Sequence, residues 1–233
     1  MNKIKVCVVV RNSVWHDPRV IKQLKEYRKY GCELYVVGEE DNRYVEEEVS
    51  KILANVNIIK FKSVPPKKKN RIRSFINVLS FYKNFSNAIS LCKPDIIHAN
   101  DLDALIGAYF ASIKCRCKVV YDTHEVFVEN FGQSSAVLQK FCWSTIERWI
   151  IRRVDLVVCV SNATAEFLSK KYNISKPLVV TNCAMRQSLD QISAVKSEKF
   201  EVLNHGQFYE ARGYDLMVSA AALTEVSDIN FVL

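Results

Sequence analysis

Short apolar runs alternate with longer amphipathic stretches along most of the chain. The apolar runs are rich in Val and Ile and show little polar alternation, which is typical of strands that are covered on both faces of a sheet. We expect strands at Ile4–Val10, Glu33–Val37, Val56–Phe61, Asp95–Ala99, Lys118–Tyr121, Asp155–Val160 and Leu178–Thr181. Helices are predicted between them, at about 73–92, 102–113, 135–153 and 163–172. The repeated strand–helix–strand order predicts right-handed crossovers and a Rossmann-like α/β fold with a doubly wound parallel sheet.

The first helix has the clearest ends. Asp17 is a suitable N-cap residue, Pro18 fits the first helical position, and Gly31 suits the position after the last turn. Val20 and Leu24 share one face of this helix. These signals together predict a helix from residue 18 to about residue 30.

The alternation of strands and helices breaks after Thr181. Residues 183–199 are polar and lack a clear period, so we interpret them as a linker. The alternation restarts afterwards, which divides the chain into an N-terminal Rossmann-like domain at 1–182, the linker, and the beginning of a second Rossmann-like domain at 200–233. One strand, one helix and part of a second strand are too few to bury a core, and we therefore expect that second domain to be incomplete.

Composition narrows the class of protein. The 233 residues are 49% hydrophobic and 25% charged, which is ordinary for a globular chain. The apolar run Val6–Val10 is too short for a signal peptide, and no run reaches the roughly 18 apolar residues of a membrane-spanning helix. We therefore expect a cytoplasmic protein.

The eight cysteines do not indicate disulfides or a metal site. Four of them, Cys7, Cys92, Cys142 and Cys159, lie inside apolar runs and are expected to be small buried hydrophobic residues. Cys115 and Cys117 have no second Cys or His pair at zinc-ligand spacing. We expect no bound metal.

The net charge of +8 is concentrated in residues 61–93, which hold eight Lys and Arg residues and no acid. A helix in this segment carries apolar residues at helical spacing: Ile72, Phe75, Leu79, Tyr82, Phe85 and Ile89. A solvated basic loop before a core-facing helix would explain the apolar positions. Residues 62–93 could instead attach to an anionic membrane surface, where each basic residue contributes about 1 kcal/mol. Nucleic acid is not expected as a partner, because the segment lacks the aromatic platform of a known RNA-binding module.

The candidate chemistry follows the predicted strands, because ligands of open parallel sheets bind at the carboxyl ends of the strands. The stretch RNSVWHDPRV after the first strand contains no glycine, which argues against dinucleotide binding. The stretches HANDLDA and DTHEVFVEN follow two later strands and place six candidates on one rim: His98, Asn100, Asp101, Asp122, His124 and Glu125. Such side chains bind sugar hydroxyls and transfer protons near neutral pH.

Structural roles compete with functional ones at several of these positions. Asp101 could cap the following helix, and for His98, at a strand end, the structural interpretation is favoured. For His124, between two acids in a loop, a functional role is favoured. A structural role is favoured for His16 next to the cap, but we keep His16 and Asp17 among the acceptor-side candidates because they follow the first strand.

Several segments carry a resemblance to a known family. DPRVIKQLKEYRKYGCELYVVG resembles the opening helix and second strand of glycosyltransferase family 4, and KPDIIHANDLDAL and KVVYDTHEVF resemble two of its internal segments. RRVDLVVCVSNATAEFLSKKYNISKPLVVTN is similar to the passage that ends its first domain. EVLNHGQFYEARGYDLMVSAAAL is similar to the first strand and helix of its second domain. The order and spacing of these segments cover nearly the whole chain.

The resemblance implies a GT-B fold, in which one Rossmann-like domain takes the acceptor and the other takes the nucleotide sugar. It also implies a metal-independent transfer that retains anomeric configuration and needs no cofactor. His124 matches the family histidine near the reacting sugar. Gly206, Gln207 and Arg212 fall at the family's diphosphate-binding pattern G-R-x-x-x-x-K-G. Arg212 can replace the lysine as a cation, whereas Gln207 departs from the pattern and leaves one phosphate contact without its cation.

The resemblance leads to one main hypothesis. The chain is a glycosyltransferase that uses a nucleotide-sugar donor and a sugar or lipid-linked acceptor in the synthesis of bacterial surface polysaccharide or glycolipid, and it works at the inner face of the cell membrane. The family's pair of donor-binding glutamates lies beyond residue 233, so we expect the chain alone to be inactive and a partner chain could supply the donor domain. Two alternatives stay open: a non-catalytic subunit of a split glycosyltransferase, and a sugar-nucleotide epimerase.

Overall fold

The computed structural model describes residues 3–14, 17–39, 47–61, 71–126, 137–183, 200–203, 213–223 and 229–232. The chain divides into two compact units, Met1–Asn182 and Cys183–Leu233. Each unit contains its own parallel sheet.

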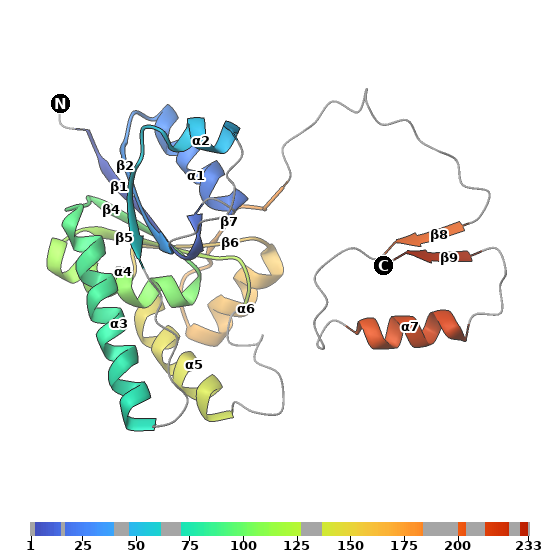
Figure 1. Ribbon diagram of the computed structural model, residues 1–233. Helices are drawn as coiled ribbons and strands as arrows, with labels where there is room; N and C mark the ends of the chain where they lie inside the picture. The colour runs from blue at the N-terminus through green and yellow to red at the C-terminus, as the bar shows by residue number, and fades with distance from the viewer. Residues whose placement is uncertain are drawn as a thin grey trace. The chain divides into compact units, whose positions relative to one another are not determined.

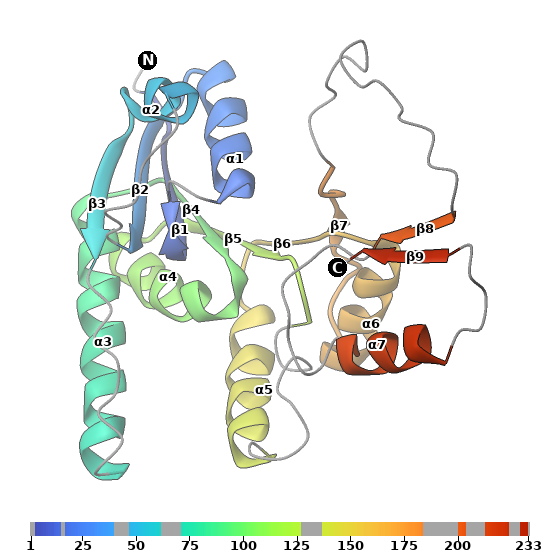
Figure 2. The same cartoon turned by 45° about the vertical axis from the view of Figure 1, so that its right-hand side comes forward.

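The first unit is a seven-stranded sheet covered by helices on both faces (Figures 1 and 2). Its elements are β1 (Lys5–Ser13), α1 (Pro18–Lys29), β2 (Glu33–Glu39), α2 (Glu47–Leu53), β3 (Asn57–Phe61), α3 (Arg71–Leu91), β4 (Ile96–Asn100), α4 (Asp101–Cys115), β5 (Lys118–Thr123), α5 (Val137–Ile151), β6 (Leu156–Cys159), α6 (Asn162–Tyr172) and β7 (Leu178–Val179). The strand order is β3-β2-β1-β4-β5-β6-β7, and every pairing is parallel. The predicted Rossmann-like fold class is confirmed.

Two hydrophobic layers enclose this sheet. Alternate residues of β1 face opposite layers, as strand geometry requires: Val6, Val8 and Val10 pack with α1 and α2, whereas Cys7 and Val9 pack with the layer of α3 to α6. All five side chains are buried. Because β1 is central and covered on both faces, it has the continuous apolar run from which the sequence predicted it.

Helix α1 begins and ends where its sequence signals predict. The Asp17 carboxylate accepts a hydrogen bond from the backbone N–H of Arg19 at 3.0 Å, and Pro18 is the first helical residue. Gly31 follows the last turn with a φ of 71°, a left-handed conformation that glycine adopts without strain. The predicted helix cap at Asp17 is confirmed.

Several strands extend beyond the predicted bounds. β1 continues to Ser13 through a register irregularity after Val9, β4 includes Asn100, and β5 ends at Thr123. The sequence pattern misses these positions because polar side chains replace the apolar run at the carboxyl ends. Helix α2 was also not predicted, since its seven residues are too few to show a clear apolar period.

Helix α3 carries buried apolar residues in its second half and exposed ones in its first half. In its second half, Phe85 and Ile89 are buried in the core, and a Cβ on Gly107 of α4 would lie only 2.4 Å from Phe85. In its first half, Ile76 and Leu79 are 57% and 55% exposed. Figures 1 and 2 both show the first halves of α3 and α5 extending beyond the sheet.

All eight cysteines are free thiols. Cys7, Cys92 and Cys159 are buried as predicted, but the prediction is wrong for Cys142, which is exposed. Cys142 lies in α5, where exposed and buried positions alternate with the helical period, so an apolar run in the sequence does not mean burial there.

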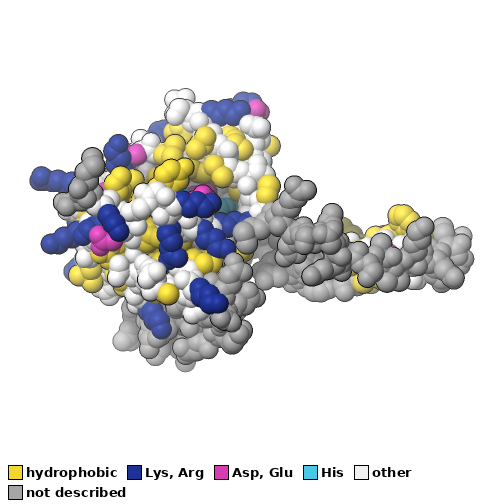
Figure 3. Space-filling view, turned by 90° about the horizontal axis from the view of Figure 1, so that it is seen from above, with side chains coloured by type: hydrophobic (Ala, Val, Ile, Leu, Met, Phe, Trp, Pro, Cys, Tyr) yellow, Lys and Arg dark blue, Asp and Glu magenta, His cyan; other side chains and the backbone are white. Residues whose placement is uncertain are grey.

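The second unit contains a single β-α-β arrangement in its described part. β8 (Phe200–Leu203) pairs in parallel with β9 (Ile229–Val232), and α7 (Tyr214–Ala222) connects them. Gly213 precedes α7 with a φ of 68°. In the described residues of both units, no helix has the length and apolarity needed to cross a bilayer. On the face seen in Figure 3, Lys and Arg side chains are interspersed with hydrophobic ones.

Candidate active site

The strand order reverses between β1 and β4, and a cluster of polar side chains lies beside this point. Asn100 pairs with Asp122 across β4 and β5, and His98 pairs with Val8 of β1. The cluster consists of Gln23, His98, Asn100, Asp122 and His124, and we call it the edge cluster. It lies at the edge where open α/β sheets bind ligands.

His98 lies within β4 and is only 7% exposed. Its Nε2 is 3.2 Å from Asp122 Oδ2, and its Nδ1 is 2.7 Å from the hydroxyl of Tyr27 on α1. The Tyr27 ring meets the imidazole edge-on, with ring centres 5.8 Å apart. Burial raises the pKa of Tyr27 to about 12, so its hydroxyl keeps its proton near neutral pH. His98 therefore lies within the strand and not in the loop after it, because β4 continues past it and buries the ring.

Asn100 and Gln23 bind each other through both amide groups. Gln23 Nε2 donates to Asn100 Oδ1 at 2.8 Å, and Asn100 Nδ2 donates to Gln23 Oε1 at 3.2 Å. Gln23 Nε2 also donates to Asp122 Oδ2 at 2.9 Å. Asn100 is 1% exposed, and this reciprocal pairing satisfies its buried amide.

His124 follows β5 and has its imidazole mostly buried, with 11% of the side chain exposed. Its Nε2 is 3.4 Å from Asn100 Oδ1 and 3.6 Å from Asp122 Oδ2. Its Nδ1 is buried and has no hydrogen-bond partner among the described residues. A buried polar atom without a partner is rare in a folded protein and calls for an explanation such as a ligand.

Asp101 connects the edge cluster to α1. Its Oδ1 accepts from the backbone N–H of His124 at 3.3 Å, and its Oδ2 lies 3.4 Å from Arg19 Nη1. Burial raises the pKa of Asp101, and the charge of Arg19 opposes that rise. Asp101 is the first residue of α4 and has a φ of 65°, which is strained for a residue with a side chain. The Asp101 carboxylate therefore fixes the loop that carries His124. Asp101 is not the N-cap of α4: Asn100 occupies that position, and it makes no side-chain cap hydrogen bond.

Arg19 and Asp17 form a tight pair on the other side of this edge. Arg19 Nε lies 2.9 Å from Asp17 Oδ1 and Nη2 lies 2.7 Å from Asp17 Oδ2, a bidentate arrangement. Burial by itself would raise the pKa of Asp17, but the hydrogen bonds from Arg19 and Asn12 outweigh burial and lower it. Asp17 is thus occupied by its cap and its arginine.

Asp103 follows Asp101 by two positions on α4. Arg11 Nη1 is 3.9 Å from its Oδ2, and the Arg11 guanidinium stands 4.6 Å from the centre of the Phe81 ring. Burial raises the pKa of Asp103 to about 6 despite the charge of Arg11. This edge of the sheet therefore holds several carboxylates that are partly removed from water.

Comparison with known proteins identifies the family. A sequence profile described as Glycosyltransferase Family 4 matches residues 19–185, well over half of the chain. The chain belongs to glycosyltransferase family 4. No curated protein sequence gives a significant match.

Solved structures share the fold at low sequence identity. A sucrose-phosphate synthase from Thermosynechococcus elongatus is 14% identical with a TM-score of 0.72, and the alignment covers 98% of this chain and 61% of that one. Alr3699/HepE from Anabaena, in complex with UDP-glucose, is 16% identical with a TM-score of 0.62, covering 98% of this chain and 59% of that one. The lipopolysaccharide outer core galactosyltransferase WaaB is 15% identical with a TM-score of 0.56, covering 98% and 60%. The first unit is thus the Rossmann-like unit of the GT-B glycosyltransferase fold, and the chain spans about three fifths of the length of these structures.

Three residues of α1 bond to this edge of the sheet, and none of them was among the candidates from the sequence. Arg19, Gln23 and Tyr27 are spaced four residues apart and therefore lie along one side of the helix. All three bond to residues of the sheet edge. A stripe of polar residues next to the apolar stripe of the first helix is the signal that could have identified them.

The remaining predicted site residues are not part of the described cluster. Glu125 is exposed, and its backbone carbonyl accepts from Thr123 Oγ1 at 2.7 Å. His16, Gly206, Gln207 and Arg212 lie outside the described residues. Within the described part of the chain, no group of three or more His, Cys, Asp or Glu side chains is arranged to hold a metal ion.

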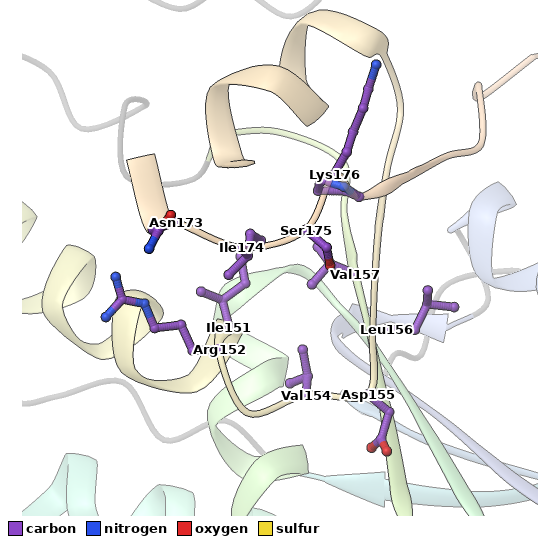
Figure 4. Close-up of a pocket in the computed structure, with 11 residues that line it drawn as sticks. Ile151, Arg152, Val154, Asp155, Leu156, Val157, Asn173, Ile174, Ser175 and Lys176 are labelled. Carbon is purple, nitrogen blue, oxygen red and sulfur yellow. The ribbon is translucent and has the colours of Figure 1, made fainter. Parts of the chain in front are cut away.

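A cavity of about 540 Å³ opens at the opposite edge of the sheet (Figure 4). It lies between the end of α5, the start of β6 and the segment that joins α6 to β7, and its apolar wall includes Ile151, Val154, Val157 and Ile174. The basic side chain of Arg152 is already bound there, with its Nε donating to the Tyr172 carbonyl at 2.8 Å. This cavity lies at the amino ends of the strands, away from the edge cluster.

Proposed function

We propose that this chain is the acceptor-side part of a glycosyltransferase, which transfers a sugar from a nucleotide-sugar donor to a sugar or lipid-linked acceptor. The observation that supports it most directly is the buried Nδ1 of His124, which has no partner among the described residues and lies at the ligand-binding edge of the sheet. A sugar hydroxyl would supply the missing hydrogen bond. Membership of family 4 supports the reaction class.

Each residue has a separate role in this proposal. His124 contacts the reacting sugar, and Asn100, Asp101 and Asp122 hold its ring and its backbone. Arg212, with Gly206 and Gln207, holds the donor diphosphate, as the family pattern implies. Transfer retains the anomeric configuration and uses no metal ion or other cofactor.

The donor is the nucleotide sugar, and UDP-glucose is the first to test, because a structural neighbour binds it.

The acceptor chemistry we propose is that of bacterial surface polysaccharide or glycolipid synthesis at the inner face of the membrane. Support comes from α3, which begins at the same sheet edge as the edge cluster because it follows β3. Exposed Ile76, Val78 and Leu79 lie on its first half, within the basic segment 62–93. Apolar side chains beside basic residues are the pattern of peripheral binding to anionic lipid.

Ligand binding tests the core of the proposal. Saturation-transfer NMR with free sugars and with UDP-glucose should show contact with the wild-type chain, and the signal should fall in His124→Ala but not in Tyr35→Phe, a hydroxyl deletion on β2. Absence of any sugar contact in the wild type would contradict the proposed function. Calorimetry with UDP-glucose measures the affinity of residues 1–233 for this donor. Epimerised nucleotide sugar formed without an acceptor would favour an epimerase instead.

Vesicle sedimentation tests the membrane surface. Binding should require anionic lipid, weaken with salt, and fall in Leu79→Glu, because that change places a charge among the exposed apolar side chains. Leu178→Glu is the matched control, since Leu178 is 53% exposed on β7 and Leu79 is 55% exposed on α3. Binding that ignores lipid charge and salt would rule out this role.

A further inference from the structure

The two ring nitrogens of His124 have different surroundings. Nε2 faces two oxygens, Asn100 Oδ1 at 3.4 Å and Asp122 Oδ2 at 3.6 Å. Nδ1 is buried and has no partner among the described residues. A neutral imidazole carries one hydrogen, and its position depends on whether its neighbours accept or donate.

The backbone of β1 decides which way the Asn100 amide points. Asn100 Nδ2 lies 3.3 Å from the carbonyl oxygen of Val9, which can only accept. The amide nitrogen must therefore face Val9 and Gln23 Oε1, which leaves Asn100 Oδ1 facing Gln23 Nε2 and His124. An oxygen that faces Nε2 requires the hydrogen to be on that nitrogen.

Gln23 controls both oxygens that face His124. Its single amide nitrogen donates one hydrogen to Asn100 Oδ1 at 2.8 Å and the other to Asp122 Oδ2 at 2.9 Å. Both hydrogens of the Gln23 amide are thus used, and both oxygens are held in place. Without this side chain, neither oxygen would accept a direct hydrogen bond from α1.

Tyr27 acts on the same carboxylate from one helical turn further along. Asp122 Oδ2 accepts from His98 Nε2 at 3.2 Å, which places the hydrogen of the neutral His98 ring on Nε2. The Tyr27 hydroxyl then donates to His98 Nδ1 at 2.7 Å. Tyr27 therefore fixes the tautomer of His98, and His98 in turn helps to fix Asp122.

We propose that Gln23 and Tyr27 are positioning residues that hold the neutral His124 imidazole in its Nε2–H tautomer and thereby reserve Nδ1 as a hydrogen-bond acceptor for a ligand hydroxyl. The site then selects a donor group, such as a hydroxyl, over an ether or carbonyl oxygen at this position. That the hydroxyl belongs to a sugar rests on the proposed function. The tautomer itself follows from the contacts of this chain alone.

Nitrogen-15 NMR of the imidazole rings in the full chain tests this directly, because the chain has only four histidines. The His124 signals are assigned by their loss in His124→Ala, and titration of the same signals shows the pH range in which the ring is neutral. In that range we expect Nε2 of His124 to be protonated and Nδ1 to be unprotonated. An Nδ1–H tautomer, or an even mixture of the two, would overturn the proposal.

Two variants test the positioning roles. Tyr27→Phe removes the donor to His98, and Gln23→Met keeps the length of the side chain without its amide. Each should shift His124 towards a mixture of tautomers, whereas Tyr35→Phe, which removes a hydroxyl bonded to Glu33, should leave the ring unchanged. Unchanged His124 signals in both folded variants would refute the positioning roles.

The wild-type spectrum still decides the tautomer if a variant fails to fold. The result is also separable from the proposed function. A chain that binds no sugar but shows the Nε2–H tautomer contradicts only the function, whereas sugar binding with the other tautomer contradicts only this inference.

Discussion

Tyr121 and Asp122 are neighbours in β5, yet they belong to two buried polar clusters on opposite faces of the sheet. Tyr121 donates to Glu147 Oε1 at 2.9 Å, and Tyr172 donates to the other oxygen, Oε2, at 2.5 Å. Asp122 belongs to the edge cluster, in which His124 Nδ1 has no partner among the described residues. One cluster is closed by the protein itself and the other is open.

The difference separates a structural cluster from a candidate ligand-binding cluster. Glu147 is 1% exposed and both its carboxylate oxygens are bonded, so it connects α5, β5 and α6 and requires no ligand. Burial raises the pKa of Tyr121 and of Tyr172, which keeps both hydroxyls as donors. Burial of polar groups alone therefore does not identify an active site. An unfilled hydrogen-bonding position at the ligand-binding edge is the more informative sign.

The largest effect should come from opening the closed cluster. Glu147→Leu removes the carboxylate oxygens that accept from the two buried tyrosine hydroxyls, and we expect a loss of about 3–5 kcal/mol in the free energy of unfolding. Urea denaturation measures it. Glu166→Leu is the control, because Glu166 is 61% exposed and its pair with Lys176 spans 3.9 Å, so its loss should stay within about 0.5 kcal/mol. Equal losses in the two variants would mean that the Glu147 cluster is not structural.

A smaller effect on stability should come from ionisation of the Asp103 carboxyl group as the pH rises. The pKa of Asp103 in the folded chain is raised from 3.8 to about 6, so the folded state holds this proton more tightly than the unfolded state does. That contribution to stability is present below about pH 4 and is lost as the pH rises through about 6. Because 26% of the Asp103 side chain is exposed, we expect its contribution to the free energy of unfolding to be about 2 kcal/mol.

Asp103→Asn tests this contribution by urea denaturation between about pH 4 and pH 7. The wild type should lose about 2 kcal/mol relative to the variant over this range, because only the wild type must ionise a partly buried carboxyl group. The exposed change Glu166→Gln serves as the reference. Parallel stability curves for wild type and Asp103→Asn would show that the raised pKa has no energetic effect.

The smallest effect should come from the open cluster. His124→Ala removes a nitrogen that has no partner among the described residues and an Nε2 contact of 3.4 Å, so we expect less than about 1 kcal/mol of destabilisation. The same change should lower the sugar signal in the NMR experiment. A loss as large as that of Glu147→Leu would mean that His124 is a structural residue and would remove the contrast between the clusters.

Much of the site could be predicted from the sequence because strand ends carry a local signal. Asn100, Asp122 and His124 directly follow apolar runs, and parallel strands place such positions at one edge. The partners on α1 could not be predicted in this way. Gln23 lies 77 residues from Asn100 and 99 from Asp122, and nothing in a local pattern pairs side chains at such separations.

Sequence alone determined the order of strands and helices apart from α2, the cap and end of α1, and the polar residues at the carboxyl edge. Hydrophobic periodicity and capping depend on residues a few positions apart. Only the tertiary structure decided that the buried His98 ring connects Tyr27 to Asp122. It also decided that Asp101 holds the backbone of His124 and that α1 supplies Gln23 to the sheet edge. Those roles depend on distances across the packed layers, where a hydrogen bond forms or fails within a few tenths of an ångström.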